Sequence, residues 1–138
     1  MERKQVKVGL HKGAGLPPGY KWSVYFLTVA ESEAKAICGE GAGYSHLVDH
    51  VKALASETDP ARPQTVDVEK LEDVFELKVK GGPLGKKSVR VFYGIEPERI
   101  ILIVGCKKKD KEGPLSPGVK KLMAIRRRKY RGGDYGKA

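Results

Sequence analysis

The sequence predicts an α+β fold: an antiparallel sheet of about four strands, with two N-terminal helices and one C-terminal helix. Three extended segments with short connections, 71–80, 88–95 and 100–106, favour an antiparallel meander. Helix-forming residues precede this meander between 31 and 57, and an amphipathic helical pattern follows it. With one strand ahead of the first helix, the predicted order is β-α-α-β-β-β-α.

The elements of the first half have local signals. The aromatic and β-branched run at 22–30 predicts a strand. Residues 31–38 then favour a helix that ends at Gly39. Ser45 is a candidate N-cap for a second helix with one apolar stripe, and the prolines of 58–64 end it.

The meander alternates as strands do. In 71–80, Glu76 and Lys78 share one face. In 88–95, Arg90 and Phe92 lie opposite a face of valines and tyrosine. The run at 100–106 is apolar at nearly every position, so it is predicted to be the central strand, buried on both faces.

The last predicted element is a helix. Ser116 is its candidate N-cap, Pro117 its first residue, and Gly132 ends it. Its predicted inward side consists of Val119, Leu122, Met123 and Ile125.

Length and composition suit one folded domain. The chain has 138 residues, of which 40% are hydrophobic and 32% charged, so it has enough apolar residues for a core. Residues 1–21 are basic and interrupted by Gly and Pro, so we expect a basic N-terminal arm rather than a packed element. The single domain is expected over 22–138.

Composition also bears on the compartment. No apolar run approaches the roughly 20 residues needed to cross a bilayer, and the N-terminus lacks the apolar core of a signal peptide. Cys38 and Cys106 do not make a disulfide framework. We therefore expect a cytoplasmic protein with reduced thiols and no membrane partner.

The net charge of +10 is unevenly distributed. Residues 101–138 contain twelve Lys and Arg against three Asp and Glu, whereas residues 25–100 carry a small negative excess. This asymmetry favours a polyanionic partner such as nucleic acid, or an acidic protein.

Several motif-like patterns are weak. The glycines of 39–44 follow a helix rather than a strand, and 81–88 lacks the spacing of a phosphate-binding loop. His46 and His50 share a helix face without a third ligand, so we expect exposed histidines and no metal. The two cysteines are expected to be buried thiols rather than nucleophiles.

The strongest feature is a convergence of basic residues from three segments. Arg90 lies in mid-strand, Lys78 and Lys80 lie on the neighbouring strand, and Lys107–Lys109 follow the central strand. A charge inside a strand costs desolvation energy unless it has a partner. That partner is either an anionic ligand or Glu76 across the strands, and the residues leave both open.

These residues carry a resemblance to the RelE/HigB superfamily of bacterial toxin components, over roughly residues 71–131. The chain has Glu-Leu-Lys at 76–78 and Arg-Val-Phe-Tyr at 90–93. Gly-Cys-Lys-Lys follows at 105–108, and a basic final helix ends the similarity. The resemblance implies a RelE-like fold and the toxin of a type II toxin-antitoxin pair.

The implied activity is a ribosome-dependent endoribonuclease, an mRNA interferase, in which the 2′-hydroxyl attacks the adjacent phosphate without metal or cofactor. The implied partners are mRNA on the ribosome and a cognate antitoxin, for which a helix-turn-helix protein is one type. The catalytic candidates are Arg90 on the phosphate, with Lys78, Lys108 and Tyr130. The RNA-binding candidates are Lys80, Lys107, Lys109, Arg126, Arg127 and Arg128. No histidine lies in the C-terminal half, so the sequence does not indicate which residue would act as the general acid.

Two other functions remain as alternatives. One is a non-catalytic RNA- or ribosome-binding module on the same fold. The other is a DNA-binding regulator with 119–131 as recognition helix, although no helix-turn-helix pattern surrounds that segment.

Overall fold

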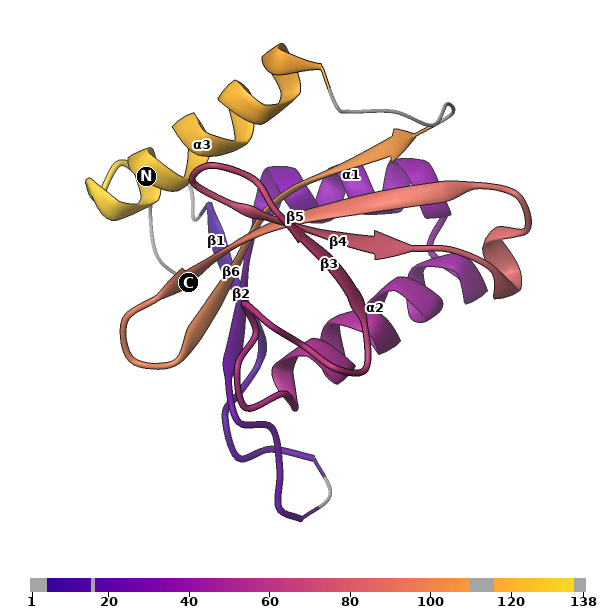
Figure 1. Cartoon of the computed structure of the whole chain (residues 1–138), viewed down its shortest axis with the longest axis horizontal. Coiled ribbons are helices and arrows are strands. Elements are labelled where there is room, and N and C mark those ends of the chain that lie inside the picture. The colour runs from indigo at the N-terminus through magenta and orange to yellow at the C-terminus, as the bar shows by residue number, and fades with distance from the viewer. Residues whose placement is uncertain (1–4, 16, 110–115, 136–138) are drawn as a thin grey trace.

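The computed structural model describes residues 5–15, 17–109 and 116–135, and it has the predicted α+β class (Figure 1). The strands are β1 (Val6–Leu10), β2 (Ser23–Leu27), β3 (Asp67–Lys70), β4 (Phe75–Val79), β5 (Ser88–Glu96) and β6 (Ile100–Lys109). The helices are α1 (Thr28–Cys38), α2 (Ala42–Ala55), the short 3₁₀ helix η1 (Gly82–Leu84) and α3 (Pro117–Arg131). Among the described residues, no helix has the length and apolar character needed to cross a membrane.

The sheet is larger than predicted and is not purely antiparallel. Its described strands number six, in the order β1-β2-β6-β5-β4-β3, and β2 pairs with β6 in parallel. The prediction of about four antiparallel strands was therefore wrong in count and direction. The chain passes through two helices and the meander before β6 reaches β2, so no tight hairpin imposes an antiparallel pairing. The edge strand β3 is short and mostly charged, so its sequence has no alternation of apolar residues from which a strand could be predicted.

Part of the N-terminal segment is packed, contrary to the expectation of an unpacked arm over residues 1–21. β1 pairs antiparallel with β2 and buries Val6. This segment has the two-residue period of a strand, with Val6, Val8 and Leu10 alternating with Lys7 and Gly9. The period was overlooked because the surrounding residues are basic.

The helix boundaries differ modestly from the predicted ones. α1 begins at Thr28, directly after β2, so the strand predicted over 22–30 is shorter. α2 begins at Ala42, and Ser45 lies inside it rather than capping it. α3 starts as predicted, because the Ser116 hydroxyl accepts from the Val119 amide at 3.3 Å.

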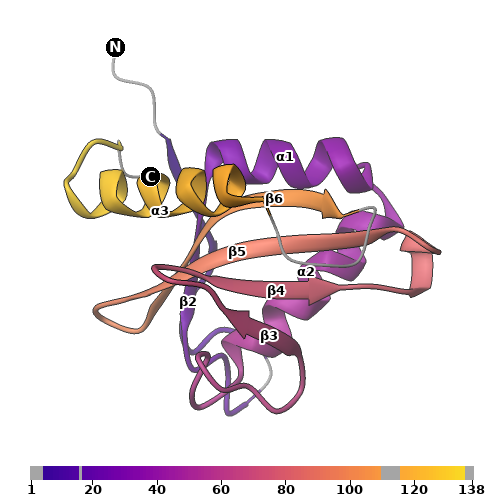
Figure 2. The same ribbon diagram turned by 45° about the horizontal axis from the view of Figure 1, so that its top comes forward.

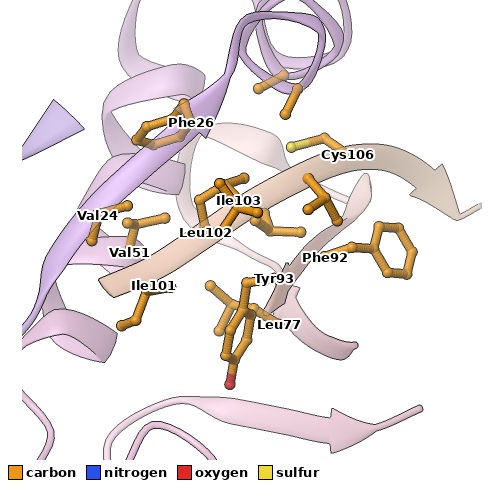
Figure 3. Close-up of a cluster of buried hydrophobic side chains, with 14 of the residues drawn as sticks. Val24, Phe26, Val51, Leu77, Phe92, Tyr93, Ile101, Leu102, Ile103 and Cys106 are labelled. Atoms are coloured by element: carbon orange, nitrogen blue, oxygen red, sulfur yellow. The ribbon is translucent and has the colours of Figure 1, made fainter. Parts of the chain in front are cut away.

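Helices cover both faces of the sheet: α1 and α2 lie behind it in Figure 1, and α3 lies across the other face. β6 is an interior strand, as predicted, and buries both of its faces along its first half. On the side of α1 and α2, Val24 and Ile101 lie near Val51 of α2 (Figure 3). Phe92 and Tyr93 project to opposite sides of β5.

A bulge in β6 decides which residues of its second half face α3. Phe92 pairs with Gly105 and Tyr93 with Ile103, so Val104 is an extra residue on β6. The extra residue shifts the alternation by one position. Cys106 consequently stays in the buried core, while Gly105 and Lys107 face the side of α3.

Two strand glycines let α3 lie close to the sheet. A Cβ on Gly105 would stand 2.4 Å from Met123 Sδ, and one on Gly94 would stand 2.5 Å from Arg127 Nε. Met123 and Ala124 are accordingly buried, whereas Leu122, predicted to face inward, is 37% exposed.

Replacement of Gly105 should therefore loosen α3. We expect Gly105→Ala to lower the free energy of unfolding by about 1–3 kcal/mol, because Met123 and Arg126 must move. Gly118→Ala, where a Cβ meets nothing within 4 Å, is the control and should leave stability unchanged or raise it. Thermal unfolding measures both, and equal stability of the two variants would contradict the close approach.

Candidate nucleic-acid interface

Three cationic side chains lie directly opposite one another across three strands. Lys78 on β4 pairs in register with Arg90 on β5, and Arg90 pairs with Lys107 on β6. Directly opposed residues of antiparallel strands project from the same face, so these three form one line, named here the cationic row. α3 lies over the other half of the same face, against Gly94 and Gly105.

Each member of the cationic row has a carboxylate partner, which offsets the repulsion of like charges side by side. The partners come from three different elements: β3, β4 and α1. The distances are 3.5 Å for Lys78 Nζ to Glu69 Oε2, 3.3 Å for Arg90 Nε to Glu76 Oε1, and 3.4 Å for Lys107 Nζ to Glu33 Oε2.

Arg90, the central member, is buried and only partly satisfied. The residue is 7% exposed, and its Nη1 donates to Ser88 Oγ at 3.1 Å. The Glu76 pairing across the strands, one of the two partners that the sequence left open, is therefore present. Nε nevertheless has no acceptor in hydrogen-bond geometry among the described residues, because the carboxylate is near but poorly aligned. A buried guanidinium N–H without an acceptor costs roughly 1–3 kcal/mol.

Glu76, which the sequence indicated only as an ion-pair partner of Arg90, is a functional candidate. The residue is 2% exposed and shares the face of Arg90. Burial raises the pKa of its carboxyl group, and the nearby charge of Arg90 only partly opposes that rise. A carboxylate with a raised pKa next to a guanidinium is suited to accept a proton. Its signal in the sequence was a glutamate inside a strand, next to a predicted basic cluster.

Glu33 of α1 connects the cationic row to α3. β2 pairs with β6 from Ile100 to Ile103, and beyond Ile103 β6 is paired with β5 on one edge but has no described strand on the edge that faced β2. Glu33 accepts from the Cys106 amide at 3.1 Å, and Arg126 donates to the Val104 carbonyl at 3.0 Å. The Arg126 guanidinium also binds Glu33 through two hydrogen bonds, of 2.8 and 3.1 Å. Glu33 and Arg126 thus supply the hydrogen bonds that a neighbouring strand would otherwise make at this edge of β6.

The surroundings of Glu33 favour its ionised form. Burial by itself would raise the pKa of the Glu33 carboxyl group. The hydrogen bonds from Arg126 and the Cys106 amide, with the charges of Arg126 and Lys107, outweigh burial and hold that pKa below its usual value of 4.5.

The arginines of α3, expected to attract RNA, are largely engaged inside the protein. Arg126 binds Glu33, and Arg127 donates from Nε to Glu96 Oε2 at 2.8 Å. Arg131 donates to the other oxygen of this buried carboxylate at 2.6 Å. Arg128 is exposed, and its Nε donates to the Ala124 carbonyl at 3.4 Å. Arg126, Arg127 and Arg131 therefore bind α3 to the rest of the fold through Glu33 and Glu96.

The lysines at the end of the sheet divide between its two faces. Lys109 pairs with Ser88 and projects on the side of the cationic row. Lys108 pairs with Val89 and projects to the opposite side, so the structure does not bring this catalytic candidate to Arg90. Lys80 is exposed one residue beyond β4.

Tyr130 lies at the other end of the sheet. It lines a hollow of about 490 Å³ with Glu96, Pro97 and Arg131. Glu96 is six residues from Arg90 along β5, or about 20 Å. Burial raises the pKa of the Tyr130 hydroxyl, with Tyr25 and Glu96 adding to the rise. The structure does not bring Tyr130 to the cationic row.

The histidines and cysteines lie on the side of α1 and α2. His46 donates from Nε2 to the Lys80 carbonyl at 2.9 Å, and His50 Nδ1 donates to the His46 carbonyl at 2.9 Å. Burial raises the pKa values of the Cys38 and Cys106 thiols. Within the described part of the chain, no three His, Cys, Asp or Glu side chains gather as a metal site would require.

Comparison with known proteins finds no matching family model, curated protein or solved structure. The resemblance to RelE and HigB toxins therefore remains a prediction from the residues quoted above.

Replacement of Glu33 should reveal its role through the pH dependence of stability. We expect Glu33→Gln to lower the free energy of unfolding at pH 7 by about 2 kcal/mol, because Arg126 and Lys107 lose their charge partner. Because the folded-state pKa of Glu33 is lowered, this stabilisation is present above pH 4.5 and is lost as the pH falls through the folded value.

Urea unfolding between pH 7 and pH 3 tests this, and the gap between wild type and variant should narrow on the acid side. Glu40→Gln is the control, because its carboxylate is 81% exposed and its ion pair with Lys35 should contribute less than about 0.5 kcal/mol. A pH-independent gap would contradict the assigned role of Glu33.

Proposed function

We propose that this protein binds RNA along the cationic row and acts as a ribosome-dependent endoribonuclease, the toxin of a toxin-antitoxin pair. The proposal rests mainly on the environment of Arg90. Its buried guanidinium lies between Lys78 and Lys107 on the neighbouring strands, and its Nε lacks an acceptor among the described residues. A phosphate oxygen supplies such an acceptor and adds the negative charge that the row favours.

In the proposed reaction the 2′-hydroxyl attacks the neighbouring phosphorus, and the bond to the 5′ oxygen of the next nucleotide breaks. Arg90 stabilises the negative charge on the phosphate oxygens, and Lys78 and Lys107 hold the strand on either side. Glu76 takes the proton of the 2′-hydroxyl. The leaving oxygen needs a proton, and the ammonium groups of Lys107 and Lys109 are donors on the same face. Neither Lys108 nor Tyr130 has a part in this reaction.

The resemblance adds the partners to this proposal: mRNA in the decoding site of the ribosome, and an antitoxin protein that blocks the row. An antitoxin with acidic groups matches the positive charge of the face and would associate rapidly by electrostatic steering.

A non-catalytic RNA-binding module is the second candidate. It is favoured by the three ion pairs of the cationic row and by the low exposure of Arg90, which keep the cations engaged before RNA arrives. Such a module binds RNA with a steep salt dependence and cuts none.

Removal of the Arg90 guanidinium should abolish cleavage. We expect Arg90→Ala to reduce cleavage of mRNA on purified ribosomes by at least about 100-fold, since one buried donor to the transition state is lost. Arg90→Lys retains a charge without the planar fork and should have intermediate activity. Arg62→Ala, a change at an exposed arginine outside the row, is the control.

Because Arg90→Ala removes the ion-pair partner of the buried Glu76, the thermal unfolding of each variant is measured as well. If the single variant is unstable, Arg90→Ala/Glu76→Gln removes both charges and tests the pair together, because it also removes the proposed base; full cleavage by it would refute both roles. Full cleavage by a folded Arg90 variant would refute the assignment, and cleavage by no form, with salt-sensitive binding intact, would favour the binding module.

Glu76 should separate proton transfer from binding. We expect Glu76→Gln to slow cleavage by about 100-fold while RNA affinity is kept or increased, because a negative charge beside the phosphate is removed. Since burial raises the pKa of Glu76, the wild-type rate should decline, as the pH falls, at a value above 4.5, and this decline should be absent in the variant. Single-turnover rates across pH measure this, and wild-type rates in Glu76→Gln would leave Glu76 as an ion-pair partner only.

A further inference from the structure

The turn between β4 and β5, residues 80–87, is named here the basic hairpin. Three of its glycines have left-handed backbone angles, with φ of 76° at Gly81, 53° at Gly82 and 62° at Gly85. The amides of Leu84, Gly85 and Lys87 each donate to a carbonyl three residues earlier, at 3.1 Å. The turn therefore has a defined internal structure around η1.

The basic hairpin is also fastened to both helices behind the sheet. Leu84 is buried beside Gly43 of α2. His46 donates to the Lys80 carbonyl, and Lys87 Nζ donates to the Ile37 carbonyl of α1 at 2.9 Å. The side chains that remain at the surface project from a backbone held by these contacts, so little backbone entropy is lost when they bind.

Those surface side chains are uniformly positive. No acidic residue occurs between 77 and 95, and the hairpin contains Lys80, Lys86 and Lys87. Lys80 and Lys86 are exposed, and Lys108 and Lys109 end β6 beside the first residues of β5. Lys80 follows Lys78 by two residues, or about 7 Å, so the hairpin continues the positive charge of the cationic row beyond the sheet.

We propose that the basic hairpin is a second RNA-docking element, in which Lys80 and Lys86 bind the phosphate backbone of a folded RNA while the cationic row holds the strand to be cut. This inference rests on the proposed function in taking RNA as the partner. Ammonium point charges fixed on a rigid turn bind phosphates without reading sequence, and so they position the protein rather than select a codon.

The chemistry of the hairpin favours RNA over an acidic protein. Protein interfaces are centred on large apolar or aromatic side chains that fill pockets in the partner. The one large apolar side chain of the hairpin, Leu84, is committed to the core. The remaining surface consists of lysines, glycines and Pro83.

The test compares charge reversals with equal change in net charge in the full chain. Lys80→Glu/Lys86→Glu alters the hairpin, and Lys52→Glu/Lys121→Glu alters two exposed lysines on α2 and α3. Binding of a fluorescent RNA stem-loop is measured between about 50 and 200 mM salt, with a polyglutamate peptide as acidic-protein probe. Circular dichroism confirms folding, and Lys80→Gln/Lys86→Gln gives a milder change at the same positions.

We expect the hairpin variant to bind the stem-loop at least tenfold more weakly, with a log–log salt slope smaller by about 1.5, as the loss of two phosphate contacts predicts. The control should lose less than about threefold. An equal loss in both variants, or a hairpin effect on polyglutamate but not on RNA, would overturn the proposal.

The same variants separate this inference from the proposed function. If hairpin-dependent binding is found and wild-type protein cleaves no mRNA, the docking element stands and the endoribonuclease is refuted. If Arg90-dependent cleavage is found and the hairpin variant binds and cleaves like the control, the docking element is refuted alone.

Discussion

The arrangement of this protein depends on one carboxylate, that of Glu33, at the edge of β6. The strand β2 leaves the sheet at Leu27 to become α1, while β6 continues for six residues beyond Ile103. Backbone groups left at such an edge need partners, and Glu33 and Arg126 supply them at Cys106 and Val104. Since Glu33 also pairs with Lys107, the contact that fastens α3 neutralises one end of the cationic row.

The fold class and the main elements were predictable because their signals are local. The apolar run of β6 predicted an interior strand, and Ser116 with Pro117 predicted the start of α3; the structure has both. The parallel pairing of β2 with β6 was not predictable, because it depends on the path of the chain through α1, α2 and the three antiparallel connections of β3, β4, β5 and β6. β1 was not predicted, because its five residues include a glycine and a lysine and so show too weak an alternation beside basic, Pro-rich neighbours.

The candidate site could be predicted less completely than the fold. The sequence placed Arg90 and Lys78 together correctly, since their strands form one hairpin. It could not decide which of three consecutive lysines faces Arg90, because the bulge at Val104 sets that alternation, and the residues facing Arg90 and Ser88 are Lys107 and Lys109 rather than Lys108. The arginines of α3 were misleading for another reason: the carboxylates that engage them, Glu33 and Glu96, lie more than thirty residues away along the chain.

The proposed function requires that a phosphate of the bound RNA accepts a hydrogen bond from the buried Arg90 Nε–H. A chain of 138 residues is small enough for the side-chain ¹⁵N–¹H signal of Arg90 to be followed by NMR, with Arg90→Lys to assign it. Titration with a short single-stranded RNA should shift this signal in proportion to the fraction bound. An Arg90 signal that stays fixed while signals elsewhere in the protein shift would place the RNA away from Arg90 and contradict the account.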